Sequence, residues 1–381
     1  MSRRGRRIGF GILIAVVVLA AAGLAGVAWY YSNLILGPDA PSSLEEQRVI
    51  AAGPDRIELS RDRESLEPGR WALQWHDGYG LLGPVIEARD SSVIREFRPI
   101  VGTPPVGHLA SIKGVSRSAD PRTMWALDYQ EVSVAGPLGA YPAWFIPGVD
   151  STWVIYTHGR GANRAEALRA LEVMHARGLP SLLISYRNDV GAPPSADHRF
   201  HLGQDEWPDL EAAVHYTLDH GARDVVLVGF SMGGQIVMQF MTNSKLASRV
   251  SAVQLESPVL NWSATLDYQA GHMGVPTFIT RLGERVATRR ARLDFGSLDR
   301  VAHAKGITAP VLLFHNVPDH ETPIWVSESL AAALPTTVTL VRIPTGNHVE
   351  AWNADHDGYC ATINAWYTER GIGTTPPVTA N

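Results

Sequence analysis

The sequence is poor in cysteine and poor in charge. Its 381 residues contain one cysteine, Cys360, and only 19% of them are Asp, Glu, Lys or Arg. A single cysteine excludes an intrachain disulfide and any metal cluster built from several thiolates. The net charge of −5 provides no basic field, so we expect no nucleic-acid partner. Glycine and proline, with 35 and 25 residues, stay near globular averages, which excludes collagen-like and low-complexity chains.

Charge is missing altogether from one stretch near the start. No charged residue occurs from Ile8 to Pro38, and the 24 residues from Ile8 to Tyr31 are apolar or nearly so. As a helix they would extend about 36 Å, which exceeds the roughly 30 Å hydrocarbon core of a bilayer. Four arginines precede this stretch and three aromatic residues close it, namely Arg3, Arg4, Arg6, Arg7, Trp29, Tyr30 and Tyr31.

These flanking residues predict an orientation in the membrane. Arginines favour the cytoplasmic side, and aromatic rings favour the membrane–water interface. We therefore expect residues 1–38 to form a single-pass anchor in the cell membrane that spans it with residues 8–31. The N-terminus would be cytoplasmic and the rest extracytoplasmic. The alternatives are a cleaved signal peptide, whose apolar region is usually about 7–15 residues long, and a buried core helix.

Residues 39–124 are expected to form a small β-rich region. Residues 71–75 alternate bulky and smaller side chains, Asp77 and Gly78 are typical of a turn, and residues 93–97 resume a strand pattern. The glycine- and proline-rich stretch 102–107 is interpreted as a connector. The residues suggest no chemistry in this part, so its predicted role is packing or spacing between the membrane and the body.

From about residue 125 short apolar runs alternate with helix-length segments. Eight strands are expected, at 131–134, 143–146, 153–156, 181–185, 225–228, 252–256, 311–314 and 338–343. This alternation predicts an α/β fold over residues 125–370, with a mostly parallel eight-stranded sheet covered by helices on both faces. In such sheets the chemistry lies at the carboxyl ends of the strands. Residues 371–381 are expected to be a flexible tail.

The string GFSMGG at residues 229–234 carries the first chemical signal. Gly-x-Ser-x-Gly alone is a weak pattern, but here it follows the strand at 225–228 and precedes a helical run. A nucleophilic serine on this motif lies on a sharp strand-to-helix turn, which glycines two residues before and after it permit. Ser231 is therefore the predicted nucleophile, and the backbone N–H of Met232 is a predicted donor to the oxyanion.

A base and an orienting acid should follow on later strands. Asp319 follows the strand at 311–314 and His348 follows the strand at 338–343, in the chain order Ser, Asp, His of this architecture. We predict that His348 takes the proton of Ser231 and that Asp319 holds the imidazole tautomer. Three neighbouring residues are alternatives for these roles: Glu321 for the acid, and His315 or His320 for the base.

The loop after the strand at 153–156 contains a His-Gly pair. In THGRGANR, residues 157–164, the residue after this pair is Arg160, whose backbone N–H is the second predicted oxyanion donor beside that of Met232. A dinucleotide loop would need a third glycine that this stretch lacks. Neither His-Glu-x-x-His nor Cys-x-x-Cys spacing occurs among the 14 histidines and the lone cysteine. We therefore expect no cofactor and no metal.

These residues resemble the α/β-hydrolase superfamily from about residue 129 to 366. The chain looks most like its serine-aminopeptidase and prolyl-oligopeptidase-like branch. HGRG at 158–161, YRND at 186–189 and GFSMGG are similar to those of membrane-anchored bacterial hydrolases. The resemblance implies a Ser–His–Asp hydrolase with the triad and oxyanion donors at the positions already named. It does not imply a substrate, because the group mixes esterases, lipases, thioesterases and peptidases.

An insertion at about 259–308 is expected to form a small helical cap, since residues 277–286 show helical apolar spacing. Five arginines between 281 and 292 either form a solvated helix face or favour an anionic substrate. The expected function is a membrane-anchored serine hydrolase that cleaves ester, thioester or amide bonds of a small-molecule or lipid-like acyl substrate. Alternatives are an acyltransferase that uses an envelope alcohol, a serine peptidase and a non-catalytic scaffold.

Overall fold

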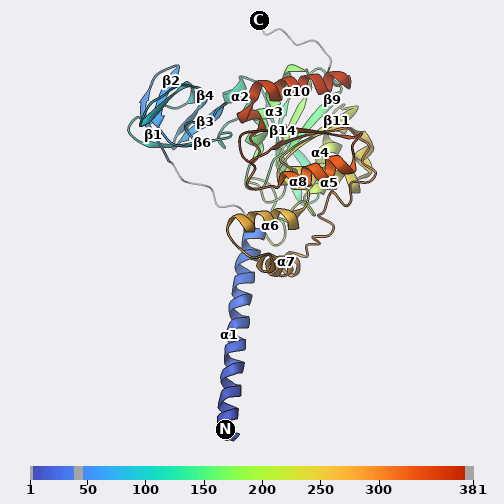
Figure 1. Ribbon diagram of the computed structural model, residues 1–381. Coiled ribbons are helices and arrows are strands. Elements are labelled where there is room, and N and C mark those ends of the chain that lie inside the picture. The colour runs from blue at the N-terminus through green and yellow to red at the C-terminus, as the bar shows by residue number, and fades with distance from the viewer. Residues whose placement is uncertain (1–2, 38–45, 374–381) are drawn as a thin grey trace.

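The computed structural model describes residues 3–37 and 46–373 of the chain. A long N-terminal helix leads to a small β-barrel and a larger α/β body, which lie side by side (Figure 1). Most of the predicted flexible tail, residues 374–381, lies outside the described residues.

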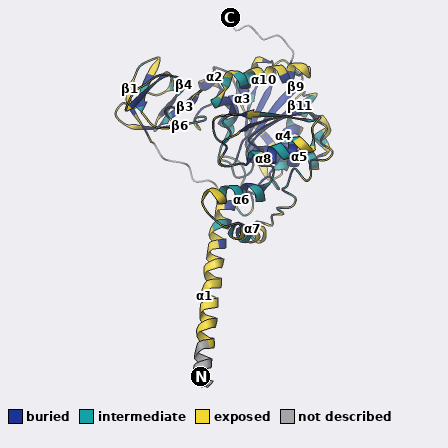
Figure 2. Ribbon diagram, viewed as in Figure 1, coloured by how far each residue is buried: buried dark blue, intermediate teal, exposed yellow. Residues whose placement is uncertain are grey.

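Helix α1, Arg3–Leu36, is the first element. From Phe10 to Leu36 it is long and apolar enough to cross a membrane, judged by length and composition. Residues 10–27 are exposed, whereas Ala28, Ser32, Ile35 and Leu36 are buried against the body (Figure 2). The C-terminal end of α1, mostly beyond the predicted span 8–31, therefore belongs to the packed part of the molecule.

The β-rich region is a closed six-stranded barrel with strand order β1-β2-β5-β4-β3-β6. Its strands are β1 (Gln47–Ala52), β2 (Arg56–Ser60), β3 (Trp71–Trp75), β4 (Gly78–Ala88), β5 (Ser92–Val101) and β6 (Leu109–Lys113). Because β6 pairs with both β1 and β3, the stretch 102–107 joins two strands of the barrel. It is not a connector between domains, and that interpretation was wrong.

The body contains all eight strands expected from the sequence. They are β7 (Gln130–Gly136), β8 (Gly139–Ile146), β9 (Thr152–Thr157), β10 (Ser181–Ile184), β11 (Asp224–Phe230), β12 (Val250–Glu256), β13 (Val311–Asn316) and β14 (Val338–Ile343). The order is β14-β13-β12-β11-β9-β10-β8-β7, and only β8 runs antiparallel to the other strands. The predicted mostly parallel α/β-hydrolase sheet is confirmed.

Helices cover both faces of this sheet (Figure 1). The strands alternate between the two cores, because Val225 and Leu227 pack into one cluster while Val226 and Val228 pack into the other. The first cluster includes side chains of α4 (Trp207–Asp219), α5 (Met232–Asn243) and α8 (Ile324–Ala333). The second includes side chains of α3 (Leu168–Ala176) and α10 (His356–Glu369).

The predicted cap consists of helices α6 (Trp262–His272) and α7 (Thr277–Ala291). Asn261 begins α6 by accepting a hydrogen bond from the Ala264 N–H at 2.9 Å. The short helices are α2 (Pro121–Trp125) and α9 (Ala351–Ala354), together with the 3₁₀ turns Arg164–Ala167 and Lys245–Arg249. In Figure 1, α6 and α7 lie beside the C-terminal end of α1.

Candidate active site

Ser231 lies on the turn between β11 and α5 in a conformation that few residues adopt. Its φ of 49° and ψ of −117° lift it above the carboxyl end of the sheet. A Cβ on Gly233 would come within 2.0 Å of the Thr157 carbonyl oxygen, and one on Gly229 within 2.7 Å of the Gly233 carbonyl oxygen. The glycines of the motif are therefore required by close backbone approach, as the sequence pattern predicts.

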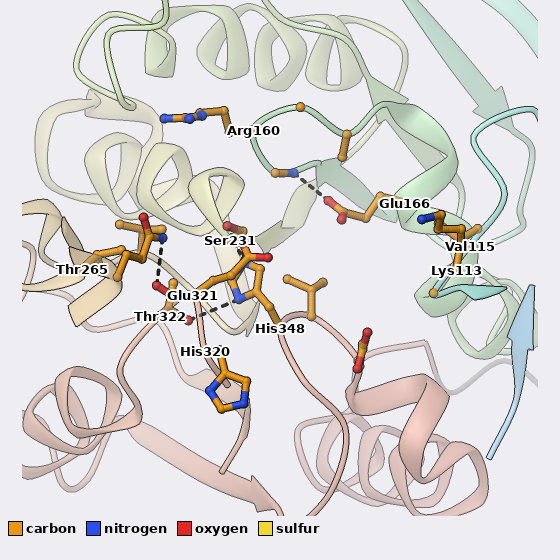
Figure 3. A pocket seen from close by; sticks show the side chains of 18 of the residues that line it. Lys113, Val115, Arg160, Glu166, Ser231, Thr265, His320, Glu321, Thr322 and His348 are labelled. Atoms are coloured by element: carbon orange, nitrogen blue, oxygen red, sulfur yellow. Dashed lines mark hydrogen bonds and ion pairs between the residues drawn. The ribbon is translucent and has the colours of Figure 1, made fainter. Parts of the chain in front are cut away.

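The structure brings the three predicted triad residues together from three different strand ends. Ser231 Oγ lies 2.8 Å from His348 Nε2, and His348 Nδ1 lies 2.8 Å from Asp319 Oδ2. Asp319 follows β13, and His348 lies in the loop between β14 and α9. Figure 3 shows Ser231 and His348 facing each other in the pocket.

Asp319 is buried and its carboxylate is fully engaged. Oδ1 accepts the backbone N–H groups of Glu321 and Thr322 at 2.8 and 2.9 Å, and Oδ2 accepts the Thr322 hydroxyl at 2.8 Å. Burial alone would raise the pKa of this carboxyl, but His348 and these hydrogen bonds outweigh burial and hold the pKa far below its usual range. Asp319 is thus ionised and fixed in place to orient the imidazole.

The negative charges around His348 and the burial of its ring shift its pKa in opposite directions. Burial lowers the pKa of the imidazole, but the negative charges of Asp319 and Glu321 outweigh burial and raise the pKa to about 9. The Glu321 carboxylate lies 3.7 Å from Nε2 of the ring, whereas Asp319 binds Nδ1. Glu321 therefore lies on the Ser231 side of the ring, which is not the position of an orienting acid.

The two alternative histidines occupy other places. His315 is fully buried, with Nδ1 2.8 Å from Ser327 Oγ and Nε2 3.1 Å from the Thr322 carbonyl oxygen, and burial lowers its pKa. His320 lines the mouth of the pocket, where its ring packs edge-on against His272 at 5.3 Å between centroids. Both contact sets differ from that of His348.

The loop after β9 approaches the nucleophile closely. A Cβ on Gly159 would lie 3.0 Å from the Ser231 Cβ, and the Gly159 N–H already donates to Glu166 Oε2 at 2.6 Å. Arg160 follows in this loop and lines the pocket, while Met232 is the first residue of α5. The assignment of their backbone N–H groups as oxyanion donors remains a prediction.

Buried polar side chains form hydrogen bonds that hold the loop after β9 in place. His158 Nε2 lies 2.8 Å from Asp189 Oδ2, and Tyr186 Oη donates to the Gly159 carbonyl oxygen at 3.2 Å. Burial opposes protonation of His158, but Asp189 outweighs burial and raises the pKa of the imidazole. The HGRG and YRND motifs therefore contact each other. From the sequence they were only family signatures, and their contact depends on the pairing of β9 with β10.

A pocket of about 700 Å³ surrounds Ser231 and His348. Part of its wall comes from α6. Another part, unexpectedly, comes from the end of β6 and the loop after it, where Lys113 and Val115 line the pocket (Figure 3). The sequence predicted only a packing or spacing role for the β-rich region, so its contribution to the pocket wall was not expected. Among the described lining residues, none of the arginines between 281 and 292 occurs, so the pocket does not support their proposed role in binding an anionic substrate.

The pocket also contains carboxylates that the sequence did not single out. Glu166 and Glu350 both line it. Burial raises the pKa of Glu350 to about 7, and its carboxylate accepts the Asn347 N–H. Glu166 accepts the Gly159 N–H and forms an ion pair with Arg169 at 3.4 Å. Glu350 thereby contacts the loop that carries His348, and Glu166 contacts the loop after β9.

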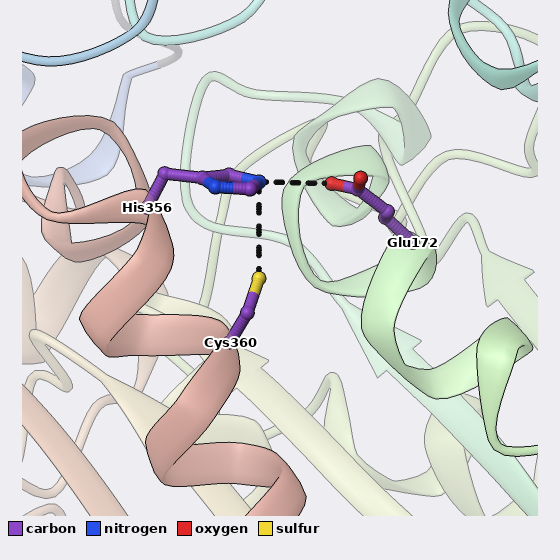
Figure 4. A group of neighbouring side chains, drawn as sticks. All are labelled: Glu172, His356 and Cys360. Atoms are coloured by element: carbon purple, nitrogen blue, oxygen red, sulfur yellow. Dashed lines mark hydrogen bonds and ion pairs between the residues drawn. The ribbon is translucent and has the colours of Figure 1, made fainter.

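One other cluster has residues of the metal-ligating type. His356 Nε2 lies 3.2 Å from Glu172 Oε2 and 3.8 Å from Cys360 Sγ (Figure 4). However, Arg70 Nη1 is 3.3 Å from the same ring nitrogen, and Asp357 Oδ1 is 2.7 Å from Nδ1. Contacts with Cys360 and Glu172 raise the pKa of His356 to about 10. A protonated ring beside a guanidinium favours an ion-pair cluster over a cation site.

Comparisons with known proteins agree with this architecture. The sequence pattern of the prolyl oligopeptidase family matches residues 188–370, and that of a domain of unknown function matches residues 48–112. An esterase of Pyrococcus furiosus resembles the chain in two crystal forms. The first has a TM-score of 0.54 and 15% identity over 66% of this chain and 94% of that one. The second has a TM-score of 0.53 and 16% identity over 66% and 96%. A comparison with curated protein sequences finds no match.

Proposed function

We propose that this chain is a serine hydrolase of the prolyl-oligopeptidase-like α/β-hydrolase family and that it cleaves carboxylic esters through a Ser–His–Asp triad. The observation that carries the proposal is the continuous relay from Ser231 to His348 to Asp319, with 2.8 Å at each step. Nucleophile and base within hydrogen-bond reach, with the base oriented by a buried acid, is the arrangement that covalent catalysis requires.

Each residue of the relay has a defined step. His348 Nε2 takes the proton of Ser231 as Oγ attacks the acyl carbon, and the negative charge on the oxyanion meets the predicted donors, the N–H groups of Arg160 and Met232. His348 then gives the proton to the leaving alcohol, and an acyl-enzyme remains. Water, deprotonated by His348, attacks the acyl-enzyme and restores Ser231. Asp319 keeps the imidazole in the required tautomer throughout.

The shape of the pocket favours a compact acyl group. Helix α6 and the loop after β6 enclose a volume of about 700 Å³ beside Ser231. That volume is in the range of pockets that hold a small-molecule or lipid-like ester. Esters also need less activation of the leaving group than amides. Ester cleavage is therefore proposed ahead of thioester cleavage and peptide cleavage.

Active-site labelling tests this proposal. The full chain in detergent should react with a fluorophosphonate probe, and Ser231→Ala should abolish the reaction while the exposed control Ser248→Ala leaves it unchanged. A folded wild-type chain that does not react would overturn the proposal. A panel of p-nitrophenyl esters and aminoacyl anilides then separates esterase from peptidase activity. Transfer of the acyl group to an added alcohol in preference to water would identify an acyltransferase.

We further propose that α1 anchors the enzyme, with its N-terminus in the cytoplasm and the catalytic domain outside. The length and apolar character of α1 and the sequence flanks on its two sides support this orientation. Alkaline phosphatase fused after residue 38 should be active in bacterial cells, because it acts only after export. An inactive fusion that is present in normal amount would contradict the orientation.

A further inference from the structure

The last two turns of α1 pack into the catalytic body. Ile35 and Leu36 belong to the same buried apolar cluster as the residues of β11 and α5. Gly283 of α7 lies against this part of α1. A Cβ at Gly283 would come within 3.0 Å of the Tyr31 Cβ and 3.8 Å of the Ile35 Cδ1. The two helices therefore approach each other closely where α7 has no side chain.

Two polar contacts reinforce this packing. The guanidinium carbon of Arg290, in α7, lies 3.9 Å from the centre of the Trp29 ring, and the same guanidinium donates to Ser32 Oγ. Ser32 in turn donates to the Trp29 carbonyl oxygen at 2.8 Å. Such contacts would not be needed if α1 were only a tether.

A second arginine joins the end of α1 to the active site. Arg160 Nη1 donates to the Ile35 carbonyl oxygen at 2.9 Å, and Nη2 donates to the Leu34 carbonyl oxygen at 3.0 Å. The last carbonyls of a helix have no partner within the helix and carry its negative dipole end, so a guanidinium there is favourable. The backbone of Arg160 belongs to the loop that closes on Ser231, as Figure 3 shows.

We propose that the end of α1, residues 28–36, is part of the catalytic domain and that Arg160 is a positioning residue between the two. Its side chain is held by the terminal carbonyls of α1, and this holds its own backbone N–H where the oxyanion forms. The proposal rests on the proposed serine-hydrolase function. It means that the anchor helix is retained in the working enzyme rather than removed.

The glycines on either side of Arg160 explain why its backbone position depends on the contacts of its side chain. Arg160 lies between two glycines, and Gly161 has a φ of 70°. Glycines leave the backbone free to move. On one side His158 and Tyr186 fix the Gly159 carbonyl, and on the other Arg117 donates to the Gly161 carbonyl oxygen. The bonds to α1 attach the residue between these two glycines through its own side chain.

A double-mutant cycle in the full chain tests the proposal. Arg160→Met removes the bonds to α1, and Gly283→Leu forces α1 away from α7 without touching the loop. With p-nitrophenyl butyrate, and with enzyme counted by fluorophosphonate titration, each change should lower kcat by about 10- to 100-fold with little change in KM. The double variant should be no slower than Arg160→Met alone, because both changes break the same link.

Matched controls separate positioning from general damage. Gly23→Leu makes the same substitution at a position where an added Cβ would contact no other part of the molecule within 4 Å. This variant should keep the wild-type kcat. Arg160→Lys should recover part of kcat, since an ammonium can still donate to one of the two carbonyls. A wild-type kcat in Arg160→Met would overturn the proposal, as would an Arg160→Lys variant no faster than Arg160→Met, or effects that multiply in the double variant. Lack of Ser231-dependent labelling in the wild type would instead overturn the proposed function.

Discussion

The charges near His348 set the pH range in which the triad can work. The imidazole accepts the Ser231 proton only when it is neutral, and its pKa is raised to about 9. Asp319 is buried and binds Nδ1 of the imidazole, whereas Glu321 lies near Nε2 and its side chain is 60% accessible to solvent. The two carboxylates therefore have separable effects on rate and on pH dependence.

We predict an alkaline activity profile. kcat/KM for a p-nitrophenyl ester should rise with pH until the imidazole is neutral, with the midpoint near the pKa of about 9. Glu321→Gln removes a negative charge, which lowers the pKa of His348, so the rising limb should shift to lower pH and activity at pH 7 should increase. The rates are measured after subtracting the Ser231→Ala background. A limb that stays in place or moves to higher pH would contradict the prediction.

Asp319→Asn should cost far more than Glu321→Gln. An amide at Asp319 can donate to Nδ1, which stabilises the wrong tautomer and leaves no proton acceptor facing Ser231. We expect kcat to fall by about 10³- to 10⁴-fold, measured by steady-state kinetics above pH 9.5. Glu321→Gln should stay within a few-fold of wild type there. Equal losses in the two variants would assign the orienting role to Glu321.

The proximity of the three proposed triad residues could be predicted from the sequence because each of them follows its own strand. Ser231, Asp319 and His348 needed only strand positions and chain order. Glu166 and Glu350 could not be found in this way. Their place in the pocket and the raised pKa of Glu350 depend on burial between segments that are distant in sequence.

At the scale of elements, the barrel is organised around one buried cation. The guanidinium of Arg95, in β5, donates to the Gly83 carbonyl at 2.7 Å and to those of Glu67, Gly69 and Ser65 at 2.8, 2.9 and 3.3 Å. Burial lowers the pKa of Arg95 to about 10. Arg95 thereby fixes the loop between β2 and β3 to the wall of the barrel.

Arg95→Met should destabilise the barrel strongly. It leaves several carbonyls without their donor, and we expect the free energy of unfolding to fall by about 3–5 kcal/mol. Arg98→Met, on the same strand but exposed, should change it by less than about 0.5 kcal/mol. Urea unfolding followed by tryptophan fluorescence measures both. Equal stability of the two variants would refute this role for Arg95.

The barrel was harder to predict than the sheet of the body. Most strands of the body are buried parallel strands with continuous apolar runs, and Gly136 and Gly139 mark the turn between β7 and β8, so all eight strands could be predicted from the sequence. The barrel strands alternate buried and exposed side chains instead of forming continuous apolar runs, and a glycine- and proline-rich stretch looks the same between two strands as between two domains. Only the closure of β6 onto β1 and β3 distinguishes the two cases.

At the scale of the whole molecule, the barrel and the body share one pocket. Asn353, which is buried in α9, donates to the Arg70 and Gly114 carbonyl oxygens at 2.8 Å each. These bonds attach the barrel loops to the helix that follows His348. The segment 113–117 is thereby placed beside Ser231, and its side chains should influence which acyl groups are accepted.

Val115→Trp should shorten the acyl chains that the enzyme accepts. The larger ring fills part of the pocket, so kcat/KM for p-nitrophenyl octanoate should fall at least about 10-fold while the acetate stays within a few-fold. Val101→Trp, on an exposed part of the barrel, serves as the control. An equal loss for both esters would show that the barrel wall does not select chain length.

The contacts at the end of α1 also set an order of events during biosynthesis. Arg160 and Arg290 are separated from their partners on α1 by 126 and 258 positions at the widest. Because chains are made from the N-terminus at about 5–20 residues per second, α1 emerges tens of seconds before α7 exists. The helix that leaves the ribosome first thus completes its packing among the last. A chain still being synthesised carries its serine before it has a fully assembled active site.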